Sequence, residues 1–277
     1  MPGFEFWGDE ERKEVNDVLE TGILMRYGFD GPRKGIWKAI ELEKEVCKTF
    51  GSKYAQLTSS GTAALTTAMV ALNIGAGDEV IMPTFTFVAS FEAILSLGAI
   101  PVLVDVDETL TLDPEAVKQA ITPRTKCIMP VHMCGSMADM DALKAICDEN
   151  DLILLEDACQ SIGGTYKGKK LGTIGHAGTF SFDFVKTITC GEGGVVMTDN
   201  EEVYTKCDGY TDHGHDHKGA DRGADLHPVY WVQFPHKRIA CGGRLSSNKK
   251  AGYLFSNPKE KPGHTKRYIV AGARYNI

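Results

Sequence analysis

The sequence predicts an α/β domain built on a mostly parallel sheet, because short β-rich runs alternate with helical segments along the chain. The runs are YAQLT (54–58), EVIMP (79–83), IPVLVD (100–105), TKCIMP (125–130) and LILLED (152–157). They are apolar on both faces, as strands buried between two layers of helices are. Helices are expected near 61–72, 87–97, 113–121 and 138–149, where they would connect parallel strands.

Both ends of this alternation differ from its middle. Two charged helical stretches, about 9–20 and 38–49, precede the first strand. Two further β-rich runs, AGTFSF (177–182) and GGVVMT (193–198), follow the last helix with only a short connection between them. We expect these two runs to form a hairpin-like return without another helical crossover.

The composition limits the classes of function. At 277 residues, 43% hydrophobic and 24% charged, the chain is typical of a soluble protein with one large domain, alone or with a smaller one attached. No apolar run approaches the ~20 residues of a membrane span, and the first residues lack a signal-peptide pattern. A net charge of -7 argues against binding to duplex nucleic acid. We therefore expect a cytoplasmic protein that binds small molecules, with neither nucleic acid nor membrane as a partner.

The eight cysteines include no C-x-x-C pair. Neither a zinc site nor a disulfide framework is indicated, and reduced, partly buried thiols are expected.

The ends of the predicted strands carry the candidate site residues, since ligands of open α/β sheets collect there. SSGTAAL (59–65) follows a strand and opens a helix. Its backbone N–H groups, the hydroxyls of Ser60 and Thr62 and the helix dipole could bind a phosphate. An ordinary helix N-cap explains the same residues equally simply.

Two charged residues also follow apolar runs. LILLEDACQS (152–161) places Glu156 and Asp157 at a strand end, where a carboxylate either caps a helix or pairs with a buried cation. Lys186 ends the run SFDFVK and looks like the last residue of a buried strand. A lysine held in an apolar pocket suits Schiff-base chemistry, whereas a lysine that extends its amine to solvent is the simpler alternative.

Aromatic residues complete the set. PTFTFVAS (83–90) places Phe85 and Phe87 between a strand and a helix, where such rings either belong to the core or offer a face to a flat ligand. A phosphate cradle, a carboxylate, a lysine and an aromatic face are together the parts of a pyridoxal 5'-phosphate (PLP) site.

The ordered motifs SSGTAAL, PTFTFVAS, LEDACQS and SFDFVKTITCGEGG resemble those of the DegT family of PLP-dependent sugar aminotransferases, which have the fold-type I architecture. The resemblance runs from near the N-terminus to about residue 230. MPGFEF at the start, VHMCGSMADMD (131–141) and TDHGHDH (211–217) are most similar to the 8-amino-3,8-dideoxy-octulosonate aminotransferase branch of that family.

The resemblance implies a role for each candidate residue. Lys186 would form the Schiff base with PLP, and Asp157 would pair with the ring nitrogen. Gln160 would lie near the 3-hydroxyl, and Phe87 would stack on the ring. Gly61, Thr62 and Ser181, together with Ser60, would hold the phosphate.

The resemblance also implies the reaction and its partners. Glutamate would donate the amino group and a keto sugar, such as 8-keto-3-deoxy-octulosonate, would accept it, in the biosynthesis of lipopolysaccharide or another cell-surface polysaccharide. The active site would be completed by the second subunit of a homodimer. Related sugar dehydratases carry histidine where this chain has Lys186, so the lysine favours transamination. A dehydratase and a non-catalytic PLP-binding or regulatory protein are the alternatives. Many relatives also carry histidine in place of Asp183, to which we assign no role.

A histidine-rich segment, TDHGHDHKGADRGADLHP (211–228), contains His213, His215, His217 and His227. Alternating imidazoles on a strand could bind a metal. The Gly and Asp content instead favours a polar loop, and we expect it to contact an anionic sugar and to hold no metal.

Residues 231–277 do not fit the remaining pattern, because their Gly, Lys and Arg residues have no regular spacing. Family members continue here with G-x-N-x-R, a helix and a small C-terminal domain. Shifting the reading frame by one base at Trp231 allows codons that spell GFNFRISELHAAVGLAQ, which has helical periodicity. We therefore divide the chain into a PLP-binding domain (1–230) and a frameshifted, non-native tail (231–277). On this hypothesis the small domain is missing or scrambled, and the chain could be inactive.

Overall fold

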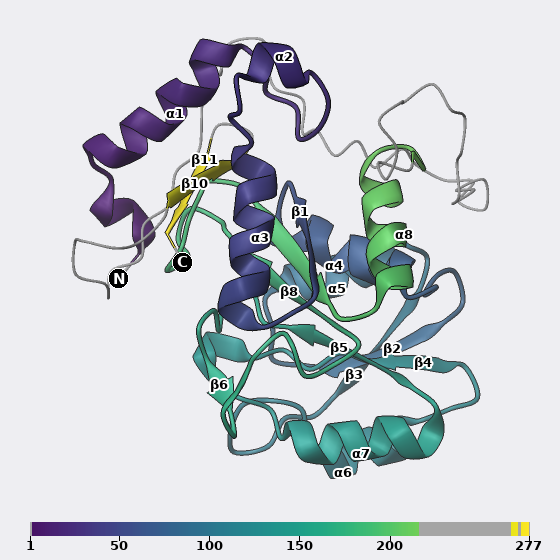
Figure 1. The fold of residues 1–277 in the computed structure, drawn as a ribbon. Helices are drawn as coiled ribbons and strands as arrows, with labels where there is room; N and C mark the ends of the chain where they lie inside the picture. Colours follow the sequence, from purple (N-terminus) through teal and green to yellow (C-terminus); the bar gives the residue numbers. More distant parts are fainter. Residues whose placement is uncertain (1, 216–266, 271–272, 277) are drawn as a thin grey trace.

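The computed structural model describes residues 2–215, 267–270 and 273–276. Residues 2–215 contain a seven-stranded sheet with helices on both faces (Figure 1). The strand order in the sheet is β1-β9-β8-β5-β4-β2-β3. The strands are β1 (Tyr54–Thr58), β2 (Glu79–Pro83), β3 (Ile100–Val104), β4 (Thr125–Ile128), β5 (Ile153–Asp157), β8 (Ala177–Ser181) and β9 (Gly194–Thr198).

The strand directions confirm the predicted α/β class with a mostly parallel sheet. Strand β9 runs antiparallel to both of its neighbours, β1 and β8, while the other neighbouring pairs are parallel. The pairing of β8 with β9 confirms the hairpin-like return. Because β9 is antiparallel to both, β1 points in the same direction as β8, and their carboxyl ends reach the same edge of the sheet.

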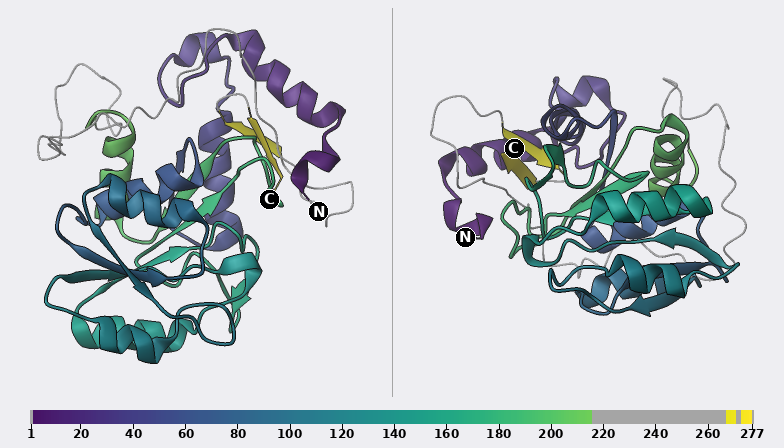
Figure 2. Two further views of the ribbon diagram at one scale, coloured as in Figure 1. Left: turned by 180° about the vertical axis from the view of Figure 1, so that it is seen from behind. Right: turned by 90° about the horizontal axis from the view of Figure 1, so that it is seen from below.

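Helices cover the two faces of the sheet (Figure 2). One face packs against α4 (Gly61–Ala71), α5 (Val88–Ser96) and α8 (Glu201–Thr211), and the other against α3 (Lys38–Phe50), α6 (Pro114–Ala120) and α7 (Met140–Asn150). Successive side chains of a strand point to opposite faces. Strand β9 accordingly sends Val196 to the α4 side and Val195 and Met197 to the α3 side.

An N-terminal arm extends away from the sheet at the top left of Figure 1. It contains α1 (Asp9–Thr21) and α2 (Asp30–Arg33), preceded by the 3-10 turn η1 (Gly3–Phe6). Arg26 joins the arm to the domain: its guanidinium donates to both carboxylate oxygens of Glu43 at 2.8 and 2.9 Å and to Asp208 at 2.9 Å. Helices α1 and α3 confirm the two predicted charged helices.

Strand β3 and helix α8 differ from the sequence prediction. The run IPVLVD was expected to be buried on both faces, but Ile100 and Leu103 are exposed because β3 is an edge strand. Helix α8 was not predicted. Its start has a local signal, because the Asn200 side chain caps the N–H groups of Glu202 and Val203.

The tail also contains regular structure. Strands β10 (Arg267–Val270) and β11 (Ala273–Asn276) pair antiparallel, and β10 lies against α3 and α1 (Figure 1). The poor periodicity of residues 231–277 as a whole predicted no strand. The strand-favouring residues Tyr268, Ile269, Val270 and Tyr275 fall in two stretches of only four residues each, so the average over the tail hides them.

The remaining elements are β6 (Thr165–Tyr166), β7 (Lys169–Lys170) and the turn η2 (Met133–Gly135). Within the described ranges, no helix combines the length and apolar content that a bilayer crossing requires.

Candidate active site

Three of the predicted site segments leave the same edge of the sheet. Ser60 and Gly61 follow β1, Asp157 ends β5 and Ser181 ends β8. Gly61 and Ser181 are in close contact, since a Cβ added at Gly61 would lie 2.7 Å from the Cβ of Ser181. A Cβ added at Gly194 would lie 2.4 Å from the carbonyl oxygen of Ser60. Because both positions are glycine, the turn after β1 can pack directly against the last residue of β8, Ser181, and the first residue of β9, Gly194.

This turn is also the N-terminus of α4. The Ser60 side chain accepts a hydrogen bond from Ala63 N at 3.0 Å, and the Ser60 carbonyl accepts the first intrahelical bond from Ala64 N at 2.9 Å. The Ser60 side-chain oxygen therefore caps α4, and the role of its hydroxyl in phosphate binding stays a prediction. The N–H groups of Gly61 and Thr62 precede that first intrahelical bond and lie at the positive end of the helix dipole.

The carboxylate of Asp157 is buried, with 3% of the residue exposed, and both of its oxygens are hydrogen-bonded. Oδ2 accepts from the Ser90 hydroxyl at 2.7 Å, and Oδ1 accepts from Cys159 N at 3.1 Å. The Thr86 hydroxyl lies 2.8 Å from the Ser90 oxygen. Because Ser90 gives its single proton to Asp157, Thr86 is the donor in this contact, with Phe87 O at 3.3 Å as a second acceptor within its reach. Both hydroxyls lie in the PTFTFVAS motif, but their role could not be predicted from it, because their partner Asp157 is distant in the sequence.

The aromatic residues and Gln160 lie on the two segments, 83–90 and 157–160, that the Ser90–Asp157 hydrogen bond joins. Phe87 is the N-cap residue of α5, one turn before Ser90, and is 59% exposed. Phe85 is also exposed, so neither ring belongs to the core. The Oε1 atom of Gln160 accepts a hydrogen bond from Cys134 N at 3.1 Å.

Lys186 does not end a buried strand, and this corrects the sequence interpretation. Strand β8 ends at Ser181, and Lys186 is the last residue of a turn that its own N–H closes by donating to Asp183 O at 3.0 Å. Phe184 and Val185 are 52% and 64% exposed at the tip of the turn. The Asp183 side chain accepts from Val185 N at 3.2 Å, which favours a turn over a strand. Asp183 therefore shapes the lysine turn.

Cys159 connects the separate parts of the site. Burial raises the pKa of its thiol well above the usual value, the nearby charge of Asp157 raises it further, and the charge of Lys186 acts in the opposite direction. Its sulfur would lie 3.1 Å from a Cβ at Gly61. Gly61 and Asp157 therefore both lie against Cys159, and Lys186 follows the end of β8, where Ser181 contacts Gly61.

Glu156 has a different task from its neighbour Asp157. It is fully buried on the opposite face of β5, and its carboxylate accepts hydrogen bonds from three N–H groups of the 172–175 loop at 2.6 to 2.8 Å. His132 Nε2 donates to it at 3.2 Å, because His132 Nδ1 already accepts from Ala138 N. Glu156 and His132 thus anchor two loops beneath the site.

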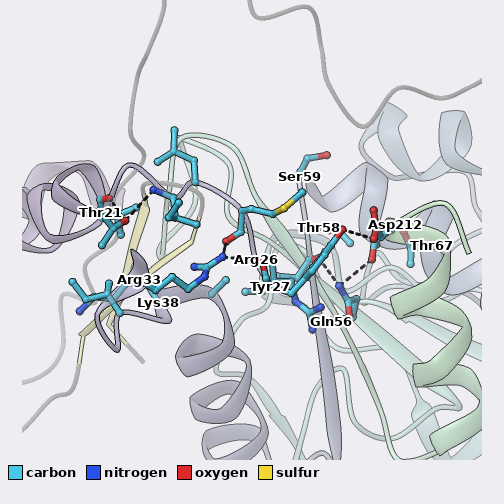
Figure 3. Close-up of a pocket in the computed structure, with 18 residues that line it drawn as sticks. Thr21, Arg26, Tyr27, Arg33, Lys38, Gln56, Thr58, Ser59, Thr67 and Asp212 are labelled. Carbon is cyan, nitrogen blue, oxygen red and sulfur yellow. Dashed lines mark hydrogen bonds between the residues drawn. The ribbon is translucent and has the colours of Figure 1, made fainter. Parts of the chain in front are cut away.

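A cavity of about 440 Å³ opens between the arm and the end of β1 (Figure 3). Thr58 and Ser59, which directly precede the α4 turn, are among its lining residues. Gln56 also lines it, and the Gln56 Oε1 atom is buried without a hydrogen-bond partner among the described residues.

The beginning of the histidine-rich segment reaches this cavity. Thr211 and Asp212 line it, and Tyr27 OH donates to Asp212 (Figure 3). His213 is exposed just beyond the end of α8, whereas His217 and His227 lie outside the described residues. In the part of the chain that the structure describes, no three His, Cys, Asp or Glu side chains gather as metal ligands.

Comparison with solved structures gives matches of similar extent. An aminotransferase from Psychrobacter cryohalolentis is 38% identical with a TM-score of 0.72, and the match covers 81% of this chain and 55% of that one. NtdA from Bacillus subtilis, solved with bound cofactor PMP, is 34% identical with a TM-score of 0.67, covering 77% and 48%. The GDP-4-keto-6-deoxymannose-3-dehydratase ColD, solved as a mutant with GDP-perosamine, is 35% identical with a TM-score of 0.64, covering 72% and 51%.

The chain thus spans about half the length of these structures. A sequence model of one family matches residues 7–242, which is most of the chain. The chain belongs to the DegT/DnrJ/EryC1/StrS aminotransferase family.

Proposed function

We propose that this chain binds PLP at the edge of the sheet and transfers an amino group from glutamate to a keto sugar. The observation that carries the proposal is the placement of Gly61, Ser181 and Asp157 at one edge of the sheet: Gly61 lies against Ser181 and against the sulfur of Cys159, and Cys159 N donates to Asp157. These residues come from three different segments, and each belongs to a type that PLP chemistry requires.

The residues present fit the cofactor. The close approach of Gly61 to Ser181 leaves a cradle that a larger residue at 61 would fill. The N–H groups of Gly61 and Thr62 and the hydroxyls of Ser60, Thr62 and Ser181 would hold the phosphate there. Asp157 would face the ring nitrogen, Phe87 would offer a ring face, and Gln160 would lie near the 3-hydroxyl.

PLP, when bound, supplies an electron sink for breaking the Cα–H bond of an amino acid. Asp157, held by Ser90 and by Cys159 N, would keep a proton on the ring nitrogen. Lys186 would attach the cofactor covalently. Once displaced by the amine of the substrate, Lys186 would move the proton from Cα as general base and then general acid.

The substrate we propose is a keto sugar of the octulosonate type, for cell-surface polysaccharide or lipopolysaccharide synthesis in the cytoplasm. The motifs MPGFEF, VHMCGSMADMD and TDHGHDH support it. The cavity beside Thr58 and Ser59 supports it also, because Thr211 and Asp212 of the last motif line that cavity. We further propose that the active enzyme is a homodimer.

A sugar dehydratase is the second candidate, favoured by the match to ColD. Lys186 argues against it, because the related dehydratases carry histidine in its place. A non-catalytic PLP-binding protein is the third candidate, and it would follow if the proposed tail disables the chain.

We also propose that residues 231–277 are the product of a frameshift at Trp231. The shifted reading GFNFRISELHAAVGLAQ, with its helical periodicity, supports this, whereas the family match continues past Trp231 to residue 242. Clean sequence reads with an uninterrupted frame through codon 231 would exclude the proposal. If the shift is confirmed, correcting it would give a gene for the chain with the repaired frame, which can then be compared with the chain as it stands.

PLP titration tests the function. The chain, as it stands and with the repaired frame, should develop the visible absorbance of a lysine-bound PLP. Lys186→Ala should abolish that absorbance, and Lys126→Ala, which removes an exposed lysine on β4, should retain it. Glutamate should then bleach the absorbance, and a keto-sugar panel should restore it. No absorbance in any form would refute PLP binding, and absorbance that glutamate cannot bleach would favour a non-catalytic protein.

A further inference from the structure

The N-terminal turn η1 packs on the turn that carries Lys186. Gly3 N donates a 2.9 Å hydrogen bond to the carbonyl oxygen of Lys186. The ring of Phe4 stacks on the ring of Phe184, with centroids 4.4 Å apart and planes 6° from parallel. Gly3 and Phe4 belong to the MPGFEF motif, and neither has a role in the proposed reaction. The two contacts join this motif to the backbone of the turn that carries Lys186.

The base of the lysine loop is fixed to the sheet, but its tip is not. Phe182 N donates to Gly193 O at 2.8 Å and Cys190 N donates to Phe182 O at 2.9 Å, which closes the base. At the tip, Phe184 and Val185 are mostly exposed. Exposed turns with few buried contacts open locally at low free-energy cost. The η1 turn supplies contacts at this tip.

We propose that Phe4 is a positioning residue: together with the Gly3 N–H group, it clasps the 183–186 turn and fixes the backbone of Lys186. A reacting group must be held within about 0.5 Å of its productive position, and a long lysine side chain depends on its backbone for that placement. One contact acts on Phe184 and the other on the Lys186 carbonyl, so together they fix both ends of the turn tip. The expected effect on PLP attachment rests on the proposed function. The contacts of Gly3 and Phe4 with the 183–186 turn do not.

The same short turn contains a matched control. Phe6 is as exposed as Phe4, at 39% each, but Phe4 is the ring that stacks on Phe184. Phe6→Ala therefore removes an equal ring from η1 and leaves the stack in place. Phe4→Trp keeps a flat ring for Phe184 and should rescue the loss caused by Phe4→Ala.

Hydrogen exchange of the chain without PLP tests the clasp directly. In Phe4→Ala, the amides of residues 183–187 should exchange about fivefold faster or more than in the unmodified chain, as expected for the loss of an aromatic contact. In Phe6→Ala and Phe4→Trp the rates should stay within about twofold of it. Unchanged exchange in Phe4→Ala would overturn the proposal, and so would an equal increase in Phe6→Ala.

Covalent capture of PLP tests the consequence for the lysine. Borohydride reduction followed by peptide mass spectrometry measures how fast PLP becomes attached to Lys186. Phe4→Ala should slow this attachment, and Phe4→Trp should restore it. Attachment at an unchanged rate, despite faster exchange, would overturn the positioning role. If the unmodified chain captures no PLP, the proposed function fails, and hydrogen exchange alone still decides the clasp.

Discussion

The hydroxyl of Ser90 donates a 2.7 Å hydrogen bond to Oδ2 of Asp157, joining residues 67 positions apart. Both residues are buried, and Thr86 completes the chain of hydroxyls by donating to Ser90. The N-terminus of α5, which carries Phe87, is thereby tied to the end of β5. The carboxylate and the aromatic ring proposed to face the cofactor are thus positioned by one shared connection.

Replacing Ser90 by alanine should weaken PLP binding about tenfold. The change removes a hydrogen bond that orients Asp157, and hydrogen bonds to charged groups contribute about 1.5 to 3 kcal/mol. Absorbance titration with PLP measures the affinity. Ser96→Ala is the control, because Ser96 lies on the same helix but donates to Ala93 O, away from Asp157. Equal affinities for the two variants would contradict the role given to Ser90.

Replacing Glu156 by alanine should destabilise the domain by about 3 to 5 kcal/mol. Three N–H groups of the 172–175 loop and His132 would lose their acceptor inside the protein, which costs far more than losing a solvated contact. Urea unfolding followed by circular dichroism measures the change. The control Glu149→Ala, at an exposed position of α7, should stay within about 0.5 kcal/mol. A small effect at Glu156 would mean that water replaces the carboxylate.

The sheet could be predicted from the sequence because its signals are local. Each apolar run between turns became a strand, and Ser60 marked the start of α4 as a cap residue does. Glu156 and Asp157 could also have been separated, since neighbours on a strand face opposite sides. The hydrogen-bond partners of these two carboxylates could not be predicted, because Ser90 and His132 reach them only through the packing of distant segments.

The turn that carries Lys186 could not be predicted from its neighbouring residues. Phe184 and Val185 look like the continuation of a strand, yet they are exposed in a turn. Apolar residues predict burial only when the chain supplies a surface to bury them on. For Phe184 that surface is Phe4, from the other end of the described domain, and no pattern around Lys186 contains that information.

Replacing Gly194 by alanine should distort the α4 turn. The new Cβ would lie 2.4 Å from the Ser60 carbonyl oxygen, and a backbone atom cannot move aside as a side-chain tip can. We expect a loss of about 2 to 4 kcal/mol of stability and weaker phosphate binding. Gly31→Ala is the control, since a Cβ at Gly31 has open space around it. Thermal unfolding with and without inorganic phosphate compares the two, and equal behaviour would contradict the proposed close contact.

The thiols near the site predict a difference in reactivity. Burial raises the pKa of Cys159, so little of the reactive thiolate forms at neutral pH. Cys134 is exposed. Iodoacetamide should therefore modify Cys134 well before Cys159 in the folded chain, and peptide mass spectrometry can follow both. The difference should disappear in urea. Faster modification of Cys159 while the chain is folded would contradict the raised pKa of this half-buried thiol.

Other buried thiols predict how stability changes at alkaline pH. Burial raises the pKa of Cys147 from 9.0 to about 12, and burial likewise raises the pKa of Cys127 and of Cys207. A raised folded-state pKa means that the neutral thiol stabilises the fold fully below pH 9.0, where the unfolded chain is also protonated. As the pH rises from 9.0 toward 12, the unfolded chain loses these protons first, so the free energy of unfolding should fall. Urea midpoints measured across this range test the fall, and Cys147→Ala should lose less of its stability over the same interval than the unmodified chain. An identical pH dependence in the two proteins would show that Cys147 titrates normally in the folded state.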